Sequence, residues 1–273
     1  MGRCTAEQAF KLRFNLQSWL KEDIGEYDYR RIGMALDIEE SAAKSCLDSF
    51  GEIVREQAAL LDADGRYIKA APPGKEASVV FIGDSITSDR LSFAKVIRSV
   101  FSGNEQLRFI DAGVSGWRTT DFVDELYLKV LQEKVQIAHV MLGTNGVRRS
   151  KQPYGKNNVS PSEFRQNLAY ILTALKESGA AVILSTLPPY DLSASTYRDG
   201  NWTIDRRDYD AFNDVILGLK GEGVAVNDMR EAYDVCEARE LLEEDGVHLN
   251  INGHMILAQR VLEILVAVMN EDH

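Results

Sequence analysis

Apolar runs alternate with amphipathic segments from residue 77 to the end of the chain. The run at 79–82 is bounded by Pro72-Pro73-Gly74 before it and Gly83 after it, which is typical of a buried strand. Further apolar runs predict strands at 107–112, 137–142, 180–184 and 224–226, and helical patterns cover 119–133, 161–177, 205–220 and 251–269. This alternation predicts an α/β fold, a three-layer α/β/α sandwich with a mostly parallel five-stranded sheet.

The residues before 77 follow a different pattern, which predicts a small and mainly helical N-terminal region. The predicted elements are a helix capped by Thr5, helices over 27–36 and 42–54, and a β-hairpin made of 58–61, a turn at 62–65 and 67–68. Three helices followed by a hairpin resemble a winged helix-turn-helix. We therefore expect two units, an N-terminal region at 1–72 and a larger domain at 77–273, joined by a linker rich in proline.

Charge argues against a nucleic-acid-binding role for the N-terminal region. The helix that would enter a DNA groove begins with Glu39-Glu40-Ser41 and has Lys44 as its main cation, whereas groove binding needs several Lys and Arg. The whole chain has a net charge of −11, which also disfavours anionic membrane surfaces. We expect the region to be a packing or oligomerisation module or a lid, with no nucleic-acid or membrane partner.

Cysteine usage and the chain ends favour a cytoplasmic location. Cys4, Cys46 and Cys236 are too few and too scattered for a disulfide framework. The first residues have no apolar core of signal-peptide length. Polar residues, Gln259 among them, interrupt the apolar segment at 251–269, so we expect a packed helix there rather than a membrane span.

Polar and glycine-containing loops follow the first three predicted strands. Gly83-Asp84-Ser85 comes after the first, a loop with Gly116 after the second, and Gly143-Thr144-Asn145 after the third. Because ligands of open α/β sheets bind outside the carboxyl ends of the strands, we expect these loops to converge on one site. Asp245 and His248 stand in a fourth loop, just before the last helix.

These residues could supply the parts of a serine-dependent ester hydrolysis. The reaction needs a hydroxyl, a base, a carboxylate that orients the base, and hydrogen-bond donors for the oxyanion. Asp245 could reach Nδ1 of His248 and leave Nε2 facing the hydroxyl of Ser85. The backbone amides of Ser85 and Gly116 and the side chain of Asn145 are available donors. The GxSxG elbow of the α/β-hydrolases is absent.

Other candidate groups have simpler explanations. His139 lies inside the third predicted strand and His254 on the last helix, so we expect core roles for both, whereas His273 ends the chain. Asp84 and Asp89 have no further ligands at suitable spacing, so no metal site is expected.

Together, the four blocks Gly83-Asp84-Ser85, Gly116, Gly143-Thr144-Asn145 and Asp245-x-x-His248 resemble those of the SGNH hydrolase family, also called GDSL esterases and lipases. The resemblance spans residues 77 to about 270. It implies a flavodoxin-like fold and hydrolysis of an ester or thioester through an acyl-enzyme, without a metal or other cofactor. It also implies that Ser85 is the nucleophile, His248 the base and Asp245 its orienting partner, with Ser85, Gly116 and Asn145 forming the oxyanion hole.

Several features bear on the substrate. The family's third block commonly reads Gly-x-Asn-Asp, and Gly146 here replaces the last residue, which puts the shape of that loop in question. Arg118, Arg148 and Arg149 lie close in sequence to proposed oxyanion donors. They belong either to solvated loops or to a site that attracts an anionic substrate. The long loops at 152–160 and 188–202 carry aromatic residues, which suit sugar stacking, an acyl pocket or simple structural packing: Tyr154, Tyr190, Tyr197 and Trp202.

We therefore expect a serine esterase that hydrolyses a small acylated substrate, with an O-acetylated carbohydrate as one candidate. An acyltransferase or thioesterase with the same residues is one alternative. A ligand-sensing regulatory protein that uses its N-terminal helices is another, and the same helices offer a surface for homo-oligomer formation.

Overall fold

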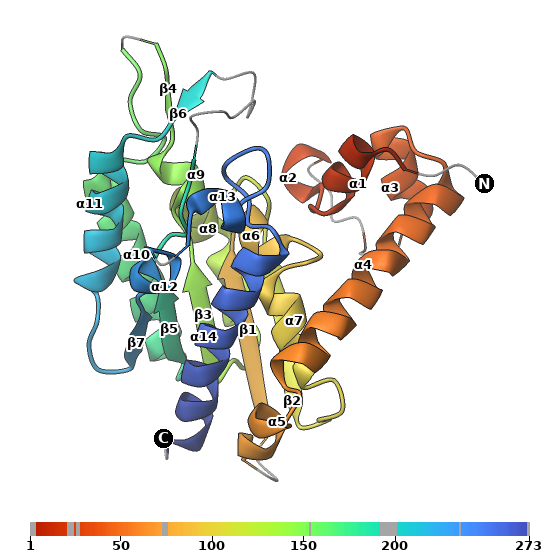
Figure 1. The fold of residues 1–273 in the computed structure, drawn as a ribbon. Helices are drawn as coiled ribbons and strands as arrows, with labels where there is room; N and C mark the ends of the chain where they lie inside the picture. The colour runs from red at the N-terminus through yellow and green to blue at the C-terminus, as the bar shows by residue number, and fades with distance from the viewer. Residues whose placement is uncertain are drawn as a thin grey trace.

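The computed structural model describes residues 4–20, 25, 28–72, 76–152, 154–191, 201–234 and 236–271. Its main feature is a five-stranded parallel sheet in the order β2-β1-β3-β5-β7 (Figure 1). The strands are β1 (Ala77–Gly83), β2 (Leu107–Gly113), β3 (Ile137–Met141), β5 (Ala181–Ser185) and β7 (Val224–Asn227). These bounds confirm the predicted strands and the α/β fold.

Both faces of the sheet are covered by helices. Val79 and Phe81 lie in one core and Val80 and Ile82 in the other. Helices α7 (Phe93–Val100) and α14 (Ile251–Asn270) cover the first face, and α8 (Thr119–Leu126), α10 (Pro161–Glu177) and α11 (Arg206–Leu217) cover the second. Because β1 is buried on both sides, its sequence is a continuous apolar run with no polar alternation.

The predicted helices of this domain are present, with one detail that the sequence did not show. The pattern at 119–133 is α8 followed by a π-helical turn, Tyr127–Leu131. Helix α14 is long and apolar enough to cross a membrane. In this structure, however, Leu257, Val261 and Leu265 of that helix are buried in the core beside the sheet, as a core helix requires.

Strand register places three loops at one edge of the sheet. Gly83 of β1 pairs with Gly113 of β2 and with Met141 of β3, so the following loops start side by side. A Cβ on Gly83 would lie 1.9 Å from Oγ1 of Thr87 and 2.9 Å from the carbonyl oxygen of Met141. Glycine is needed at the end of β1 because the next turn packs directly against the backbone.

The N-terminal region packs beside this edge of the sheet and along one flank. Its helices are α1 (Ala6–Leu12), α2 (Gln17–Leu20), α3 (Tyr29–Leu36), α4 (Glu40–Leu61) and α5 (Arg66–Ala70). Thr5 caps α1 as predicted. Helices α1, α3 and α4 share a small core that includes Leu12, Ile32 and Ala43. Figure 1 shows α1–α3 close to the loops around α6 (Ser85–Ser88), while α4 runs down past α7.

The predicted β-hairpin at 58–68 is wrong. Residues 58–61 are the last turn of α4. Ala58 continues the buried face of that helix, one turn after Val54. The residues that follow the turn form α5, whose Tyr67 amide donates to the carboxylate of Asp62 at 2.8 Å. Ala and Leu are strong helix formers, and their i, i+4 spacing here continues the α4 pattern. Without the hairpin, the comparison with a winged helix does not hold.

The remaining described elements are short and lie mostly near the carboxyl edge of the sheet. They are α9 (Thr144–Val147), the antiparallel pair β4 (Arg149–Ser150) and β6 (Trp202–Thr203), α12 (Arg230–Asp234) and α13 (Ala238–Leu241).

Candidate active site

Ser85, His248 and Asp245 form a hydrogen-bonded chain at the carboxyl edge of the sheet. Nε2 of His248 lies 2.8 Å from Oγ of Ser85, and Nδ1 lies 2.5 Å from Oδ2 of Asp245. Burial raises the pKa of Asp245, but hydrogen bonds from the ring and backbone of His248 outweigh it and bring that pKa below its ordinary value. An ionised carboxylate can therefore hold the imidazole with Nε2 turned to the hydroxyl, which is the arrangement that activates a serine.

Local turns place these side chains. Asp84 caps α6 through a hydrogen bond from the Ile86 amide to its Oδ1, 3.1 Å long, and Ser85 is the first residue of that helix. In the fourth loop, Oδ1 of Asp245 accepts hydrogen bonds from the amides of Val247 and His248, both at 3.0 Å. The carboxylate thus shapes its own loop while Oδ2 holds the ring.

The proposed oxyanion donors follow β1, β2 and β3 at the same edge. Among the described residues, the amides of Ser85 and Gly116 have no hydrogen-bond acceptor. Gly116 has φ +84°, a left-handed backbone that suits glycine. The side-chain amide of Asn145 donates one hydrogen to the carbonyl of Trp117 at 3.0 Å, and its second hydrogen is left for another acceptor.

Gly146 lies in a tightly packed loop. A Cβ at this position would be 3.3 Å from both Phe212 and Val159, so these side chains occupy the space that a larger residue would need. Asn158 donates to the carbonyl of Asn145 at 2.9 Å. Residues of the segment 157–159 thus hold this loop in place. Apolar side chains occupy the space beside Gly146 where other family members commonly have an aspartate.

The three arginines differ in their surroundings. Arg118 pairs with Asp121 at 2.8 Å, and Arg149 pairs with Asp205 at 3.0 Å. Arg148 is buried, bonds Oδ1 of Asn145 at 2.5 Å and lies over the ring of Trp202 at 5.6 Å. Arg148 therefore orients a proposed oxyanion donor, while the charges of the other two are already paired. Binding of an anionic substrate by these arginines stays a prediction.

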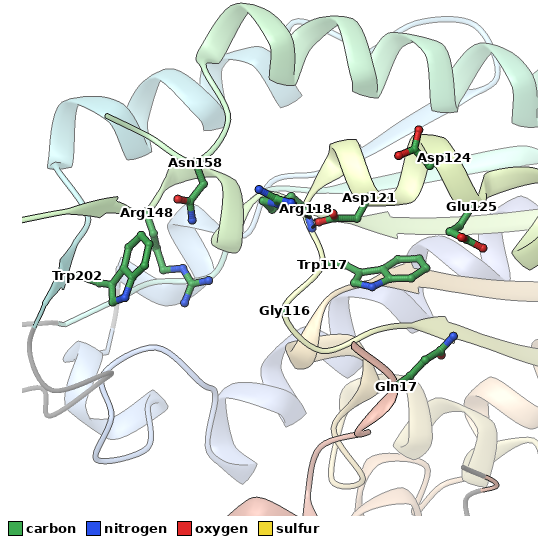
Figure 2. Close-up of a pocket in the computed structure, with 10 residues that line it drawn as sticks. All are labelled: Gln17, Gly116, Trp117, Arg118, Asp121, Asp124, Glu125, Arg148, Asn158 and Trp202. Atoms are coloured by element: carbon green, nitrogen blue, oxygen red, sulfur yellow. Dashed lines mark hydrogen bonds and ion pairs between the residues drawn. The ribbon is translucent and has the colours of Figure 1, made fainter. Parts of the chain in front are cut away.

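A cavity of about 560 Å³ adjoins the oxyanion loop (Figure 2). It is lined by Gln17, Gly116, Trp117, Arg118, Asp121, Asp124, Glu125, Arg148, Asn158 and Trp202. Figure 2 shows Trp117 and Trp202 on opposite sides of the cavity, with charged side chains between and beyond them. Of the aromatic residues noted in the long loops, Trp202 lines this cavity, Tyr154 is exposed, and Tyr197 lies outside the described residues.

The sequence interpretation missed side chains that the N-terminal region brings to the site. Phe14 lies with its ring centroid 4.4 Å from that of His248, and Phe10 lies at 5.9 Å. Arg13 is buried and pairs with Asp89 at 2.5 Å. Asn15 contacts the loop that carries Gly116. No local motif marks these residues, because their partners are distant in sequence.

The other two described histidines lie away from this hydrogen-bonded chain. His139 is buried in β3 with Nε2 2.8 Å from Oγ of Ser185, and burial lowers its pKa to about 3. His254 is buried on α14, and its Nδ1 accepts a hydrogen bond from the Phe93 amide at 3.4 Å. Both positions are those expected for core residues.

Several solved structures and a curated sequence are similar to this chain, among them the following three. The lipase/acylhydrolase from Enterococcus faecalis aligns with a TM-score of 0.58 and 23% identity, covering 70% of this chain and 96% of that one. Axe2, an acetylxylan esterase from Geobacillus stearothermophilus, aligns with a TM-score of 0.56 and 20% identity, covering 73% and 96%. The uncharacterized lipoprotein YqeF of Bacillus subtilis (strain 168) is 30% identical over 97 residues, and the match spans 36% of this chain and 38% of that protein.

The two structures share the fold of this domain. Residues 81–256 match the GDSL-like Lipase/Acylhydrolase family, a stretch that contains the proposed nucleophile, oxyanion donors and base. The match begins after the N-terminal helices, as the motifs indicated. The chain therefore belongs to the GDSL-like lipase/acylhydrolase family of ester hydrolases.

Proposed function

We propose that this chain is a serine esterase that removes a small acyl group from a carbohydrate, through an acyl-enzyme on Ser85. The hydrogen-bonded chain from Ser85 through His248 to Asp245 is the observation that carries the nucleophile assignment. Support for the carbohydrate comes from the cavity beside Gly116.

The reaction follows from the positions of these groups. Oγ of Ser85 attacks the acyl carbonyl as its proton passes to Nε2 of His248, and the carbonyl oxygen becomes an oxyanion held by the amides of Ser85 and Gly116 and by Asn145. When the C–O bond to the sugar breaks, His248 returns the proton to the leaving oxygen. Water then attacks the acyl-enzyme, giving its proton to His248, and the acid leaves as Ser85 regains its hydrogen.

The lining of the cavity favours a polar leaving group over a long acyl chain. Asp121, Asp124 and Glu125 lie on one side with Arg118, and Asn158 lies near Arg148. Burying a hydrocarbon chain against these charges would be costly, whereas sugar hydroxyls can exchange hydrogen bonds with them. Trp117 and Trp202 offer the apolar faces against which a sugar ring can lie.

The likeness to acetylxylan esterases points in the same direction. Axe2 and a second structure, the acetyl xylan esterase AlAXEase, are both acetylxylan esterases by name. Their substrate combines a short acyl group with a sugar, which is the combination that the cavity in this chain could accept.

The nucleophile assignment is tested by Ser85→Ala. We expect kcat for aryl acetates to fall by at least about 10³-fold, because hydrolysis loses its covalent intermediate while the oxyanion donors remain. A fluorophosphonate probe should label the parent once per chain and leave Ser85→Ala unlabelled, as read by intact mass. Turnover of Ser85→Ala at the parent rate would disprove the assignment.

The carbohydrate assignment is tested by Trp202→Ala. Loss of the ring should raise KM about 5–10-fold for acetylated xylo-oligosaccharides, which corresponds to roughly 1 kcal/mol of aromatic contact, and should leave KM for aryl acetates within twofold. Tyr154→Ala is the matched control, because Tyr154 is 86% exposed and does not line the cavity. Equal effects of Trp202→Ala on both substrates would count against a sugar in this cavity.

A further inference from the structure

Arg13, the residue that follows α1, is buried and makes contacts on two sides of the proposed site. Only 5% of its surface is exposed. Its Nε and Nη2 donate to the carboxylate of Asp89, with Nη2 2.5 Å from Oδ2. Asp89 ends α6, since its amide donates to the carbonyl of Ser85 at 2.9 Å. Arg13 is therefore anchored to the short helix that begins with the nucleophile.

The same guanidinium also reaches the loop that carries His248. Nη1 of Arg13 pairs with the carboxylate of Glu243, and Nη2 donates to the carbonyl of Leu249 at 2.9 Å. Leu249 is the next residue after His248, and the amide of Glu243 donates to the carbonyl of His248 at 2.8 Å. The guanidinium thus links the nucleophile helix to Leu249, which follows the proposed base, and to Glu243, whose amide bonds the carbonyl of the base.

Neighbours of Arg13 contact other parts of the site. The ring centroid of Phe14 lies 4.4 Å from that of His248, with the two ring planes tilted by 40°. The side chain of Asn15 donates to the carbonyl of Gly113 at 2.9 Å and accepts from the amide of Ser115 at 3.0 Å, in the loop that leads to Gly116. Arg13, Phe14 and Asn15 therefore contact the nucleophile helix, the base loop and the oxyanion loop.

We propose that Arg13 is a positioning residue that sets the placement of His248 relative to Ser85, so that residues 13–15 are a working part of the active site. This inference rests on the proposed function, because it assigns Arg13 to the reaction of Ser85. A guanidinium suits the task because its rigid fork can bond two carboxylates and a carbonyl in fixed directions. Geometry matters because a shift of about 1 Å in a reacting group can cost about 10²-fold in rate.

The decisive variants change the link to the base loop and keep the buried pair with Asp89. Glu243→Ala removes one acceptor from Arg13. Because 28% of the Glu243 side chain is exposed, we expect this variant to fold. We expect kcat to fall about 10-fold with KM within twofold, and fluorophosphonate labelling of Ser85 to slow in parallel. Glu243→Gln keeps an acceptor oxygen and should recover most of the rate.

Arg13→Lys should lower kcat by about 10²-fold, because a single ammonium cannot bond both loops in the directions that the guanidinium fixes. The matched control is Lys11→Met in α1, two residues before Arg13. The exposed pair of Lys11 with Glu7 lies outside the site, so its loss should leave kcat unchanged. Each rate is divided by the concentration of sites titrated with the fluorophosphonate, which separates a slower site from a smaller folded fraction.

Two failures are distinguishable. If the parent is not labelled at Ser85 and hydrolyses no ester, the proposed function fails and the role of Arg13 fails with it. If the parent is active and labelled, but Glu243→Ala and Arg13→Lys keep the parent kcat per titrated site, the positioning role alone is overturned. Recovery by Glu243→Gln after a loss in Glu243→Ala supports it.

Discussion

The two ends of helix α6 carry carboxylic acids with opposite chemistry. Asp84 precedes Ser85 and Asp89 ends the same helix, and each is at most 1% exposed. Burial raises the pKa of Asp84 to about 6, and its Oδ2 has no hydrogen-bond partner among the described residues. Burial acts on Asp89 too, but His254, with Nε2 3.5 Å away, and the charge of Arg13 bring that pKa down to about 2.

This difference shows what the N-terminal region contributes to the site. Burial disfavours the charged form of a carboxyl group, whereas a guanidinium bonded to that group favours the charged form. The cation for Asp89 comes from Arg13, 76 residues earlier in the chain. The charge at the far end of the nucleophile helix is thus stabilised by His254, inside the residues 81–256 that match the family, and by Arg13, outside them.

Among the variants that test this difference between Asp84 and Asp89, Asp89→Ala should have the largest effect on stability. The substitution removes the main partner of Arg13 and leaves Glu243 as the one anion paired with this buried cation among the described residues, so the free energy of unfolding should fall by about 3–5 kcal/mol. Urea denaturation measures it. Asp111→Ala, which removes a partner of Lys95 and Arg98 near the surface, should cost about 1 kcal/mol or less. Similar losses of unfolding free energy in both variants would mean that the buried pair stabilises the protein no more than the surface pair does.

A smaller effect is expected for the pH dependence of the unfolding free energy, to which Asp84 contributes. Its pKa is raised from 3.8 in the unfolded chain to about 6 in the folded one, so the folded state holds this proton more tightly. The stabilisation is fully present below pH 3.8 and is lost as pH rises through 6. Between pH 3 and pH 7, the parent should therefore lose about 3 kcal/mol of unfolding free energy relative to Asp84→Asn, which cannot ionise.

Urea denaturation of both proteins at several pH values gives this difference directly. Because all other groups are shared, their contributions cancel in the comparison. A constant difference across this range would show that Asp84 keeps an ordinary pKa, and the contrast with Asp89 would then rest on geometry alone.

The central sheet and the loops of the site could be predicted because their signals are local. Each buried strand is a continuous apolar run that ends in glycine or polar residues, and parallel pairing brings the ends together. Ser85, Asn145 and His248 each follow such a signal or lie in a short motif. The hairpin at 58–68 was wrong because short apolar runs beside a turn fit strand and helix alike, and here the longer periodicity of α4 decided between them.

By itself, the sequence determined the order of strands and helices, the motifs of the hydrolase family and the residues offered for catalysis, since these depend on neighbours a few positions apart. Tertiary structure alone decided that Arg13 and Phe14 reach the site, that the charge of Arg149 is paired with Asp205, and that the two acids around Ser85 differ. The physical reason is that burial and ion pairing depend on which distant segments meet, and a buried charge is stable only where such a partner arrives.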